Sequence, residues 1–458
     1  MNVLLISCYE LGHQPFGLAS PAAHIVAAGF PVQCLDLAVE SFDDERVRAA
    51  DFVAISIPMH TAIRLGVKAA ARVREINAHC HICFYGLYAS LNGDYLLRTG
   101  ADSVVGGEFE QPLVNLIKSL AGNGSTDDGV WTKARRSGPF LGRQQFLPAV
   151  RGLLPPLEKY ARLDDRTALK LVGYTEASRG CVHRCLHCPI TPVYAGRVRI
   201  VQEDVVRADI RNLVELGAQH ITFGDPDFLN GVKHSLRVAR NLHEDFPHLT
   251  FDITTKIEHI VQHRGLFAAL RTLGCVFILS AVEALNDTIL AYLEKGHTAA
   301  DVVEALRITR AAGIALRPSL VAFTPWTSLE DYLYVLEFVE EYDLIYHVDP
   351  VQYSIRLLVP PGSSLLGTPQ LAPFLGALDE EAFSYSWTHP DPRLDALHLE
   401  VSKTVERAAR VAEDPLATFY KVKDLALAAL TGRAFSSAKL RVTQPADRPP
   451  RLTESWFC

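Results

Sequence analysis

ASRGCVHRCLHCP, at residues 177–189, places Cys181, Cys185 and Cys188 on one short loop with the spacing C-x3-C-x2-C. Three thiolates on one loop can hold three irons of a four-iron cluster and leave the fourth iron open to another ligand. The alternatives are a zinc site, with His183 or His187 as the fourth ligand, or three unliganded thiols. The spacing favours the cluster, so the loop predicts a 4Fe–4S site.

The overall composition of the chain is typical of a globular protein. The chain has 458 residues, 48% of them hydrophobic, and a formal net charge of −7, which argues against a surface built to bind nucleic acid. Nine scattered cysteines are not a disulfide framework. The N-terminal apolar run lacks a basic start and is too short for a signal peptide or a membrane span. We therefore expect a cytoplasmic protein that binds neither nucleic acid nor membranes.

Two stretches of alternating strands and helices flank the cysteine loop. In residues 1–120, apolar strands such as 3–7 and 52–57 alternate with helices near 20–28 and 62–76, which predicts a Rossmann-like α/β domain. Residues 121–165 are rich in Gly, Ser, Asp and Pro and are interpreted as a linker.

Residues 166–360 predict a partial (β/α)6 barrel, with its active site at the C-terminal ends of the strands. The expected strands lie near residues 172–178, 220–223, 250–255, 276–281, 315–323 and 347–355. The expected helices include 203–216, 300–312 and 329–342. Residues 361–440 are expected to be mainly helical, and residues 441–458 to form a flexible tail.

The cysteine loop resembles that of a known superfamily. Residues 176–189, EASRGCVHRCLHCP, look like the cluster loop of radical S-adenosylmethionine (radical SAM) enzymes that carry an N-terminal cobalamin-binding-like domain, and the resemblance extends over residues 1 to about 400. It implies that the open iron binds the amino and carboxylate groups of SAM, and that one-electron reduction cleaves a carbon–sulfur bond. It also implies an electron donor such as flavodoxin or ferredoxin and a small-molecule or soft-element substrate.

The resemblance transfers SAM-binding roles to positions at other strand ends. The stretch 223–228, FGDPDF, resembles the motif that binds the SAM amino group; the alternative is a strand-to-helix turn with an Asp cap. Lys256 is a candidate for the SAM carboxylate or a solvated lysine, and Glu283 for the ribose. The turn at 321–326, VAFTPW, lacks the family's glycines, so Phe323 or Trp326 would stack on adenine. The predicted cofactor-binding residues are Gly224, Asp225, Asp227, Lys256, Glu283 and Phe323.

Cobalamin is a further cofactor of the first domain under this resemblance. The lower-ligand motif Asp-x-His-x-x-Gly is matched at His13 alone, with neither flanking position kept. Relatives without the histidine also bind cobalamin, and residues 86–90 and 104–110 resemble the loops that cradle it. The alternative is that His13 and His60 lie in turns and do not bind cobalt.

The last residues, RLTESWFC, resemble the ending of the CUAEP/CCAEP-tail radical SAM (seleno)protein family. That family ends in Cys, then Cys or selenocysteine, then Ala-Glu-Pro, which makes Cys458 a candidate catalytic thiol. We hypothesise that a UGA selenocysteine codon follows codon 458; a stop codon other than UGA, or a UGA not followed by codons for Ala-Glu-Pro, would refute this. Thiol and selenol groups suit soft acceptors such as arsenite.

Three functions follow from these resemblances. The related arsinothricin-forming enzymes transfer a 3-amino-3-carboxypropyl group from SAM to arsenic, so the first expectation is such a transfer to a soft acceptor. The second is a cobalamin-dependent radical SAM methyltransferase. The third, from a different class, is a non-catalytic iron–sulfur or metal-binding protein.

Overall fold

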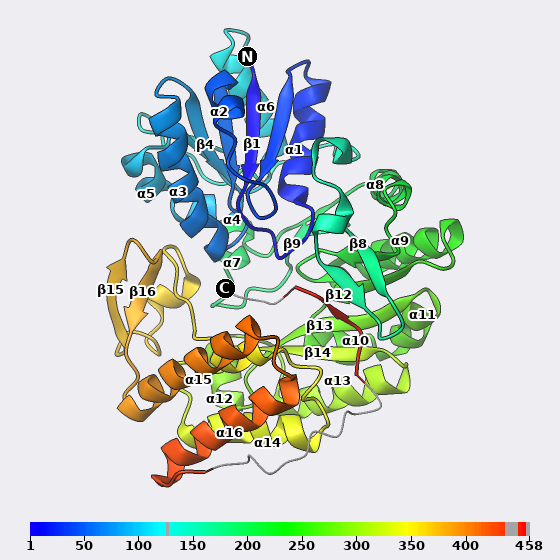
Figure 1. Ribbon diagram of the computed structural model, residues 1–458, viewed down its shortest axis with the longest axis vertical. Helices are drawn as coiled ribbons and strands as arrows, with labels where there is room; N and C mark the ends of the chain where they lie inside the picture. The colour runs from blue at the N-terminus through cyan, green and yellow to red at the C-terminus, as the bar shows by residue number, and fades with distance from the viewer. Residues whose placement is uncertain (125–127, 436–447, 455–458) are drawn as a thin grey trace.

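The computed structural model describes residues 1–124, 128–435 and 448–454, which form two α/β units and a helical region (Figure 1). This confirms the predicted fold class. In the described part of the chain, none of the helices combines the length and apolarity that crossing a bilayer requires.

The first unit is a doubly covered sheet with strand order β2-β1-β3-β4-β5-β6. Its first five strands are parallel and almost wholly buried, as continuous apolar runs require. Helices α1 and α6 cover one face of the sheet and α2 to α5 the other. The strands are β1 (Val3–Ser7), β2 (Val32–Asp36), β3 (Phe52–Ser56), β4 (His81–Tyr85), β5 (Ser103–Val105) and β6 (Val130–Thr132), and the helices are α1 (Phe16–Ala27), α2 (Asp44–Ala49), α3 (His60–Ile76), α4 (Leu87–Leu91), α5 (Gly93–Thr99) and α6 (Glu110–Leu120).

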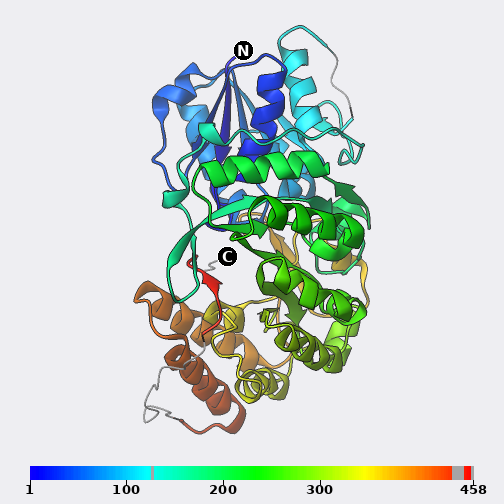
Figure 2. The ribbon, with the colours of Figure 1, turned by 90° about the vertical axis from the view of Figure 1, so that its right-hand side faces the viewer.

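The second unit is a curved sheet with strand order β14-β13-β12-β11-β8-β7-β17. The five strands from β14 to β8 in this order are parallel, and helices pack against their outer face (Figure 2). The strands are β7 (Arg162–Asp164), β8 (Leu169–Thr175), β11 (His220–Phe223), β12 (Thr250–Thr254), β13 (Cys275–Glu283), β14 (Ala315–Leu320) and β17 (Arg451–Leu452). The helices are α8 (Glu203–Glu215), α9 (Val232–Asp245), α10 (Ile257–Gln262), α11 (Phe267–Thr272), α12 (Asp287–Tyr292), α13 (Ala299–Ala311) and α14 (Leu329–Glu341).

The sixth barrel strand, expected near residues 347–355, is not formed. The chain makes a 3-10 helix there, η5 (Pro350–Ser354), with the proline at its start. Proline has no backbone N–H to donate to a ladder, so the strand cannot begin at that point. The parallel pairing continues only as an isolated bridge between Phe323 and Arg356.

The expected linker and tail both contain ordered strands. Within residues 121–165, β6 joins the first sheet antiparallel to β5, and β7 joins the barrel sheet antiparallel to β8. In the expected flexible tail, β17 pairs with β7, and the Thr453 N–H donates to the carbonyl of Arg162 at 2.8 Å. The side chain of Leu452 packs against an apolar cluster that includes Phe277. Cys458 lies outside the described residues.

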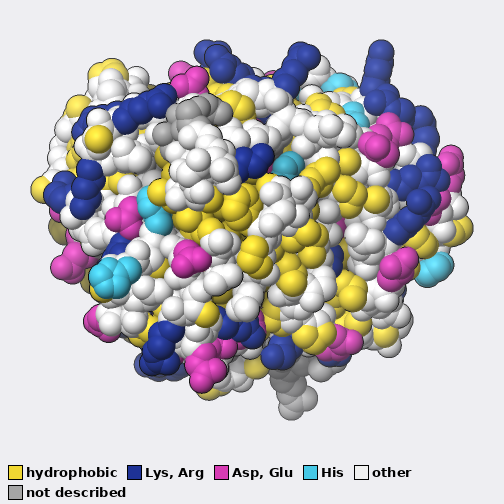
Figure 3. Space-filling model, turned by 90° about the horizontal axis from the view of Figure 1, so that it is seen from above, with side chains coloured by type: hydrophobic (Ala, Val, Ile, Leu, Met, Phe, Trp, Pro, Cys, Tyr) yellow, Lys and Arg dark blue, Asp and Glu magenta, His cyan; other side chains and the backbone are white. Residues whose placement is uncertain are grey.

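The region between the barrel and the tail holds two long helices, α15 (Pro392–Arg410) and α16 (Pro415–Thr431). It also holds a hairpin that the sequence did not predict, β15 (Leu375–Asp379) with β16 (Ser384–Trp387). On the outer face of the first unit, basic side chains are interspersed with acidic ones around a central group of hydrophobic residues (Figure 3).

Candidate active site

The C-terminal end of the first sheet faces the barrel unit (Figure 1). His13 follows β1 of the first sheet, and its ring lies 4.8 Å from that of Tyr174 in the first barrel strand. Because ligands of open α/β sheets and of barrels bind at these strand ends, this is where the two units would share a site.

The cysteine loop begins where β9 (Ser178–Gly180) leaves the barrel and pairs with β10 (Val198–Ile200). Gly180 has φ +74°, and a Cβ there would lie 2.3 Å from the carbonyl oxygen of Arg197, so only glycine fits. Beyond it, Asn230 fixes the loop by accepting a hydrogen bond from the Val182 N–H at 3.2 Å.

The three cysteines of the loop are unbridged and close enough for their charges to interact. Burial, with a smaller contribution from the neighbouring thiolates, raises the pKa of Cys181 to about 11 and that of Cys188 to about 12. A group of thiolates held this close is favoured only with bound cations between them. The donor set therefore fits a cluster held by Cys181, Cys185 and Cys188.

Glu283 ends the long strand β13 and lies beside the cysteine loop. Its carboxylate is 3.1 Å from Nε2 of His187 in the loop and 3.2 Å from the buried ammonium of Lys295. Burial raises the pKa of Glu283, but the charge of Lys295 and the hydrogen bond from His187 outweigh burial and hold the pKa well below its ordinary value. Glu283 is also strained, with φ +66°. An ionised, fixed acceptor of this kind suits ribose hydroxyls.

Gly224 and Asp225 lie at the end of β11, against the first barrel strand. A Cβ on Gly224 would lie 1.9 Å from the hydroxyl oxygen of Tyr174. The Asp225 carboxylate accepts hydrogen bonds from the Ala177 N–H at 2.8 Å and from the hydroxyl of Ser178. Burial raises the pKa of Asp225 to about 7. Both residues thus shape the chain that leads into the cysteine loop, and their contact with SAM stays a prediction.

Asp227 acts as a helix cap, as the alternative interpretation of its motif allowed. Its carboxylate accepts from the Leu229 N–H at 3.0 Å and from the Thr255 hydroxyl at 2.7 Å. Lys256, which follows β12, is buried and lies 3.1 Å from Glu258. The solvated lysine considered as an alternative is therefore wrong.

The expectation that Phe323 stacks on adenine is wrong. Its ring is only 2% exposed and packs against Tyr332 and His398, with ring centroids 4.7 and 5.0 Å away. The apolar core covers the ring, so it is not available to stack on adenine. Trp326, the other candidate, is half-buried at the edge of Tyr292.

Two groups of functional residues went unnoticed in the sequence. The first is a buried ion cluster between the units, in which the Arg179 guanidinium pairs with Glu176 at 2.6 Å, Glu110 at 2.7 Å and Glu108 at 3.3 Å. Burial raises the pKa of Glu108 to about 7. The nearer arginine outweighs burial at Glu110 and lowers its pKa to about 2.

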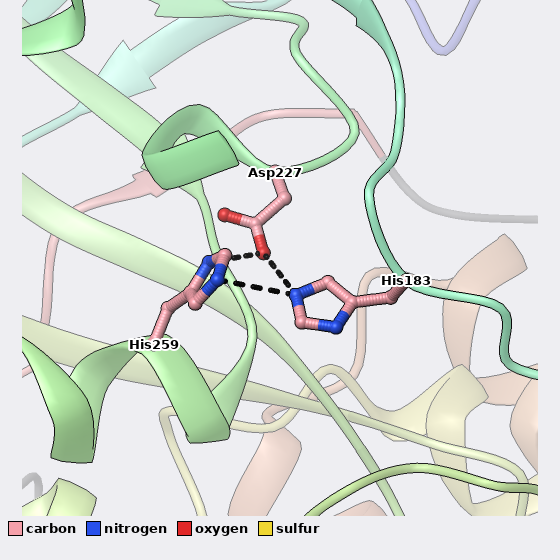
Figure 4. A group of neighbouring side chains, drawn as sticks. All are labelled: His183, Asp227 and His259. Atoms are coloured by element: carbon pink, nitrogen blue, oxygen red, sulfur yellow. Dashed lines mark hydrogen bonds and ion pairs between the residues drawn. The ribbon is translucent and has the colours of Figure 1, made fainter. Parts of the chain in front are cut away.

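The second group is formed by His183, Asp227 and His259, which converge beside the cysteine loop (Figure 4). Nε2 of His183 is 3.2 Å from Nε2 of His259, and Nδ1 of His259 is 2.9 Å from the Asp227 carboxylate. These residues come from three separate segments; His183 and Asp227 were each candidates in the sequence, for zinc and for SAM, but nothing there connected them with His259.

The first unit has features that fit a bound cofactor at its strand ends. Among the described residues, the hydroxyls of Ser7, Thr61 and Ser90 are buried without a hydrogen-bond partner; Ser7 ends β1, and the other two lie in α3 and α4, the helices that follow β3 and β4. Buried polar atoms are normally satisfied, so unpartnered ones at or just beyond three neighbouring strand ends indicate a missing polar ligand. Burial lowers the pKa of His13 to about 4, which keeps its imidazole neutral at pH 7. The site therefore fits the cobalamin that the resemblance implied.

Comparisons with known proteins assign both units. Residues 2–117 match the B12 binding domain, and residues 175–325 match the radical SAM superfamily. These domains bind cobalamin and a 4Fe–4S cluster with SAM, respectively, which confirms the predicted cofactors.

Hopanoid C-3 methylase of Methylococcus capsulatus is 25% identical over 326 residues, which cover 68% of this chain and 62% of that protein. The chain thus spans less than two thirds of this relative's length.

Two solved structures share the fold. The cobalamin-dependent SAM radical enzyme OxsB, with aqua-cobalamin and SAM bound, has a TM-score of 0.71 at 13% identity, covering 93% of this chain and 72% of the OxsB chain. The radical SAM methyltransferase TsrM of Kitasatospora setae, with tryptophan and a SAM analogue, has a TM-score of 0.61 at 16% identity, covering 75% and 71%. With the cysteine loop and both domain matches in agreement, the chain carries a B12-binding domain over residues 2–117 and, after it, a radical SAM domain over residues 175–325.

Proposed function

We propose that this protein is a cobalamin-dependent radical SAM methyltransferase that acts on a small molecule. The observation that carries the proposal is the contact between the strand ends of the first unit and the first barrel strand, where the ring of His13 lies 4.8 Å from that of Tyr174. The cysteine loop and Glu283 lie at one side of this contact, and the unpartnered hydroxyls of the first domain lie at the other. The similarity to proteins named as methylases and methyltransferases supports methyl transfer over the other functions.

The chain's own residues bind and orient the reactants. When bound, the cluster supplies one electron for cleavage of SAM, and cobalamin supplies methyl-transfer chemistry. Cys181, Cys185 and Cys188 hold the cluster, Glu283 accepts hydrogen bonds from the ribose, and Lys256 offers a positive charge to the SAM carboxylate. The buried walls of the barrel exclude water from a reactive radical.

Aminocarboxypropyl transfer to arsenite has weaker support. It depends on the resemblance of the final residues, and Cys458 lies outside the described part of the chain. A small-molecule acceptor and an electron donor such as flavodoxin or ferredoxin are part of both proposals.

Product analysis separates the functions. The protein would be reconstituted anaerobically with iron, sulfide and cobalamin, then given SAM, a reductant and candidate acceptors, arsenite among them. We expect S-adenosylhomocysteine together with 5′-deoxyadenosine, and neither from a Cys185→Ala variant. Methylthioadenosine as the main product would refute methyl transfer and support aminocarboxypropyl transfer. Intact SAM with a fully loaded cluster would indicate a non-catalytic protein.

A further inference from the structure

His183, Asp227 and His259 bring three potential ligand atoms together from three elements. His183 lies in the cysteine loop, Asp227 follows β11, and His259 lies on α10 after β12. One ligand atom from each residue falls in a group whose members all lie within 4.8 Å of one another (Figure 4). We propose that these three side chains bind one divalent transition-metal ion, separate from the cluster.

The distances suit a small metal ion. Bonds of 2.0–2.2 Å in a tetrahedral site place ligand atoms about 3.4 Å apart. From the carboxylate of Asp227, Nε2 of His183 lies 3.8 Å away and Nδ1 of His259 lies 2.9 Å away. A donor set of two imidazoles and one carboxylate is typical of Zn²⁺ and of non-haem Fe²⁺ sites.

His259 supplies an independent sign of a missing ligand. Its residue is 7% exposed, and its Nδ1 lies 2.9 Å from the Asp227 carboxylate without the alignment of a hydrogen bond. Nδ1 is therefore a buried polar atom without a hydrogen-bond partner among the described residues. Such atoms are uncommon in folded proteins, and a bound ion at this point would satisfy the group.

The surroundings resemble those of known metal sites. Metal-bound histidines usually place the other ring nitrogen against a carboxylate, and Nδ1 of His183 lies 3.4 Å from Glu258. Glu258 in turn pairs with Lys256 at 3.1 Å. The two carboxylates and the one ammonium leave a formal charge of −1 around the site, which favours a cation.

The proposed metal site is partly exposed to solvent and has only three protein ligands. The side chain of His183 is 15% exposed, whereas that of Asp227 is 1% exposed, so the opening lies on the histidine side. Three protein ligands leave a fourth position open to water or another small ligand. A metal here would tie the loop between Cys181 and Cys185 to the ends of β11 and β12.

Zinc binding to the cluster-loaded enzyme tests the proposal. Protein carrying four irons per chain would be incubated with Zn²⁺ and desalted, and its zinc and iron counted by mass spectrometry. We expect one zinc per chain with no loss of iron. His183→Asn and His259→Asn should each weaken zinc binding at least about tenfold.

His263→Asn is the matched control, because its ring lies 5.7 Å from that of His259 without belonging to the ligand group. This variant should bind zinc as the parent does. Iron content shows whether each variant has folded around its cluster. Zinc that binds only as iron is lost, or that binds both histidine variants as well as the parent, would overturn the proposal, as would a cluster-loaded parent that retains no zinc.

Discussion

Replacing Arg179 with methionine should destabilise the protein strongly, and by an amount that depends on pH. The guanidinium pairs with Glu108, Glu110 and Glu176 between the two units. Methionine keeps an apolar stem against the phenylalanine rings around the guanidinium but removes the charge. The carboxylates then stay buried without a cation.

Protonation of the buried carboxylates limits how much free energy of unfolding the variant loses. A carboxyl group with an ordinary pKa of 4.5 can be neutralised at pH 7 for about 3.4 kcal/mol, at 1.36 kcal/mol per unit. Glu108, with its pKa raised to about 7, is already half neutral at that pH, and Glu176, whose pKa burial also raises, adds less than Glu110. We therefore expect a loss of about 3–4 kcal/mol at pH 7, within the range for a broken buried ion pair. At pH 5.5 neutralising Glu110 costs about 2 kcal/mol less, so the loss should be smaller by about that amount.

The sign of the pH dependence follows from Glu110. In the parent its lowered pKa adds stability above pH 4.5 that is lost as the pH falls toward 2. In the variant its pKa should lie above the ordinary value, so stability is lost as the pH rises above 4.5. The two stability curves should therefore converge in acid.

Anaerobic urea unfolding followed by fluorescence would measure the difference. Arg237→Met is the control, because Arg237 pairs with Glu203 at 2.7 Å but is half-exposed, and its loss should cost less than about 1 kcal/mol. Adding Glu110→Gln to Arg179→Met should restore part of the stability. Equal losses for the two arginines, or a loss at Arg179 that grows in acid, would refute the reasoning.

Three further predictions concern the site. Cys185→Ala should lose the cluster's iron, whereas Cys275→Ala, in a buried strand, should keep it; iron and sulfide assays decide this. Gly224→Ala should cost about 1–3 kcal/mol in unfolding free energy because its methyl group would overlap a tyrosine side chain, whereas Gly265→Ala, with open space around it, should change stability by less than about 0.5 kcal/mol. Glu283→Gln should weaken SAM binding by about tenfold or more, measured by equilibrium dialysis; unchanged affinity would remove Glu283 from the ribose site.

Elements with strong local signals were predictable. The helix Leu329–Glu341 carries a capping box, with Ser328 and Asp331 bonded to each other's backbone, and it was expected over 329–342. The apolar run at residues 220–223, expected to be a strand, forms β11. The hairpin of residues 375–387 was missed because much of it is exposed, so it lacks a buried apolar pattern.

The site was predictable only where its residues are neighbours in sequence. The three cysteines share one loop, so their spacing sufficed. The ion pairs of the Arg179 side chain, by contrast, depend on how the two units pack. The closeness of the His183 and His259 rings depends on the register of separate strands. No local pattern carries that information, because long-range packing decides it.

The short strand β17 has a consequence for how the protein is made. It covers the outer edge of β7, yet Arg162 and Thr453, which bond across this edge, are 291 positions apart. During synthesis β7 leaves the ribosome long before β17, so the backbone edge of β7 stays unpaired until β17 has been made. Such edges recruit strands from other chains. Stalled or truncated products that end before Arg448 should therefore be the species that aggregate during expression.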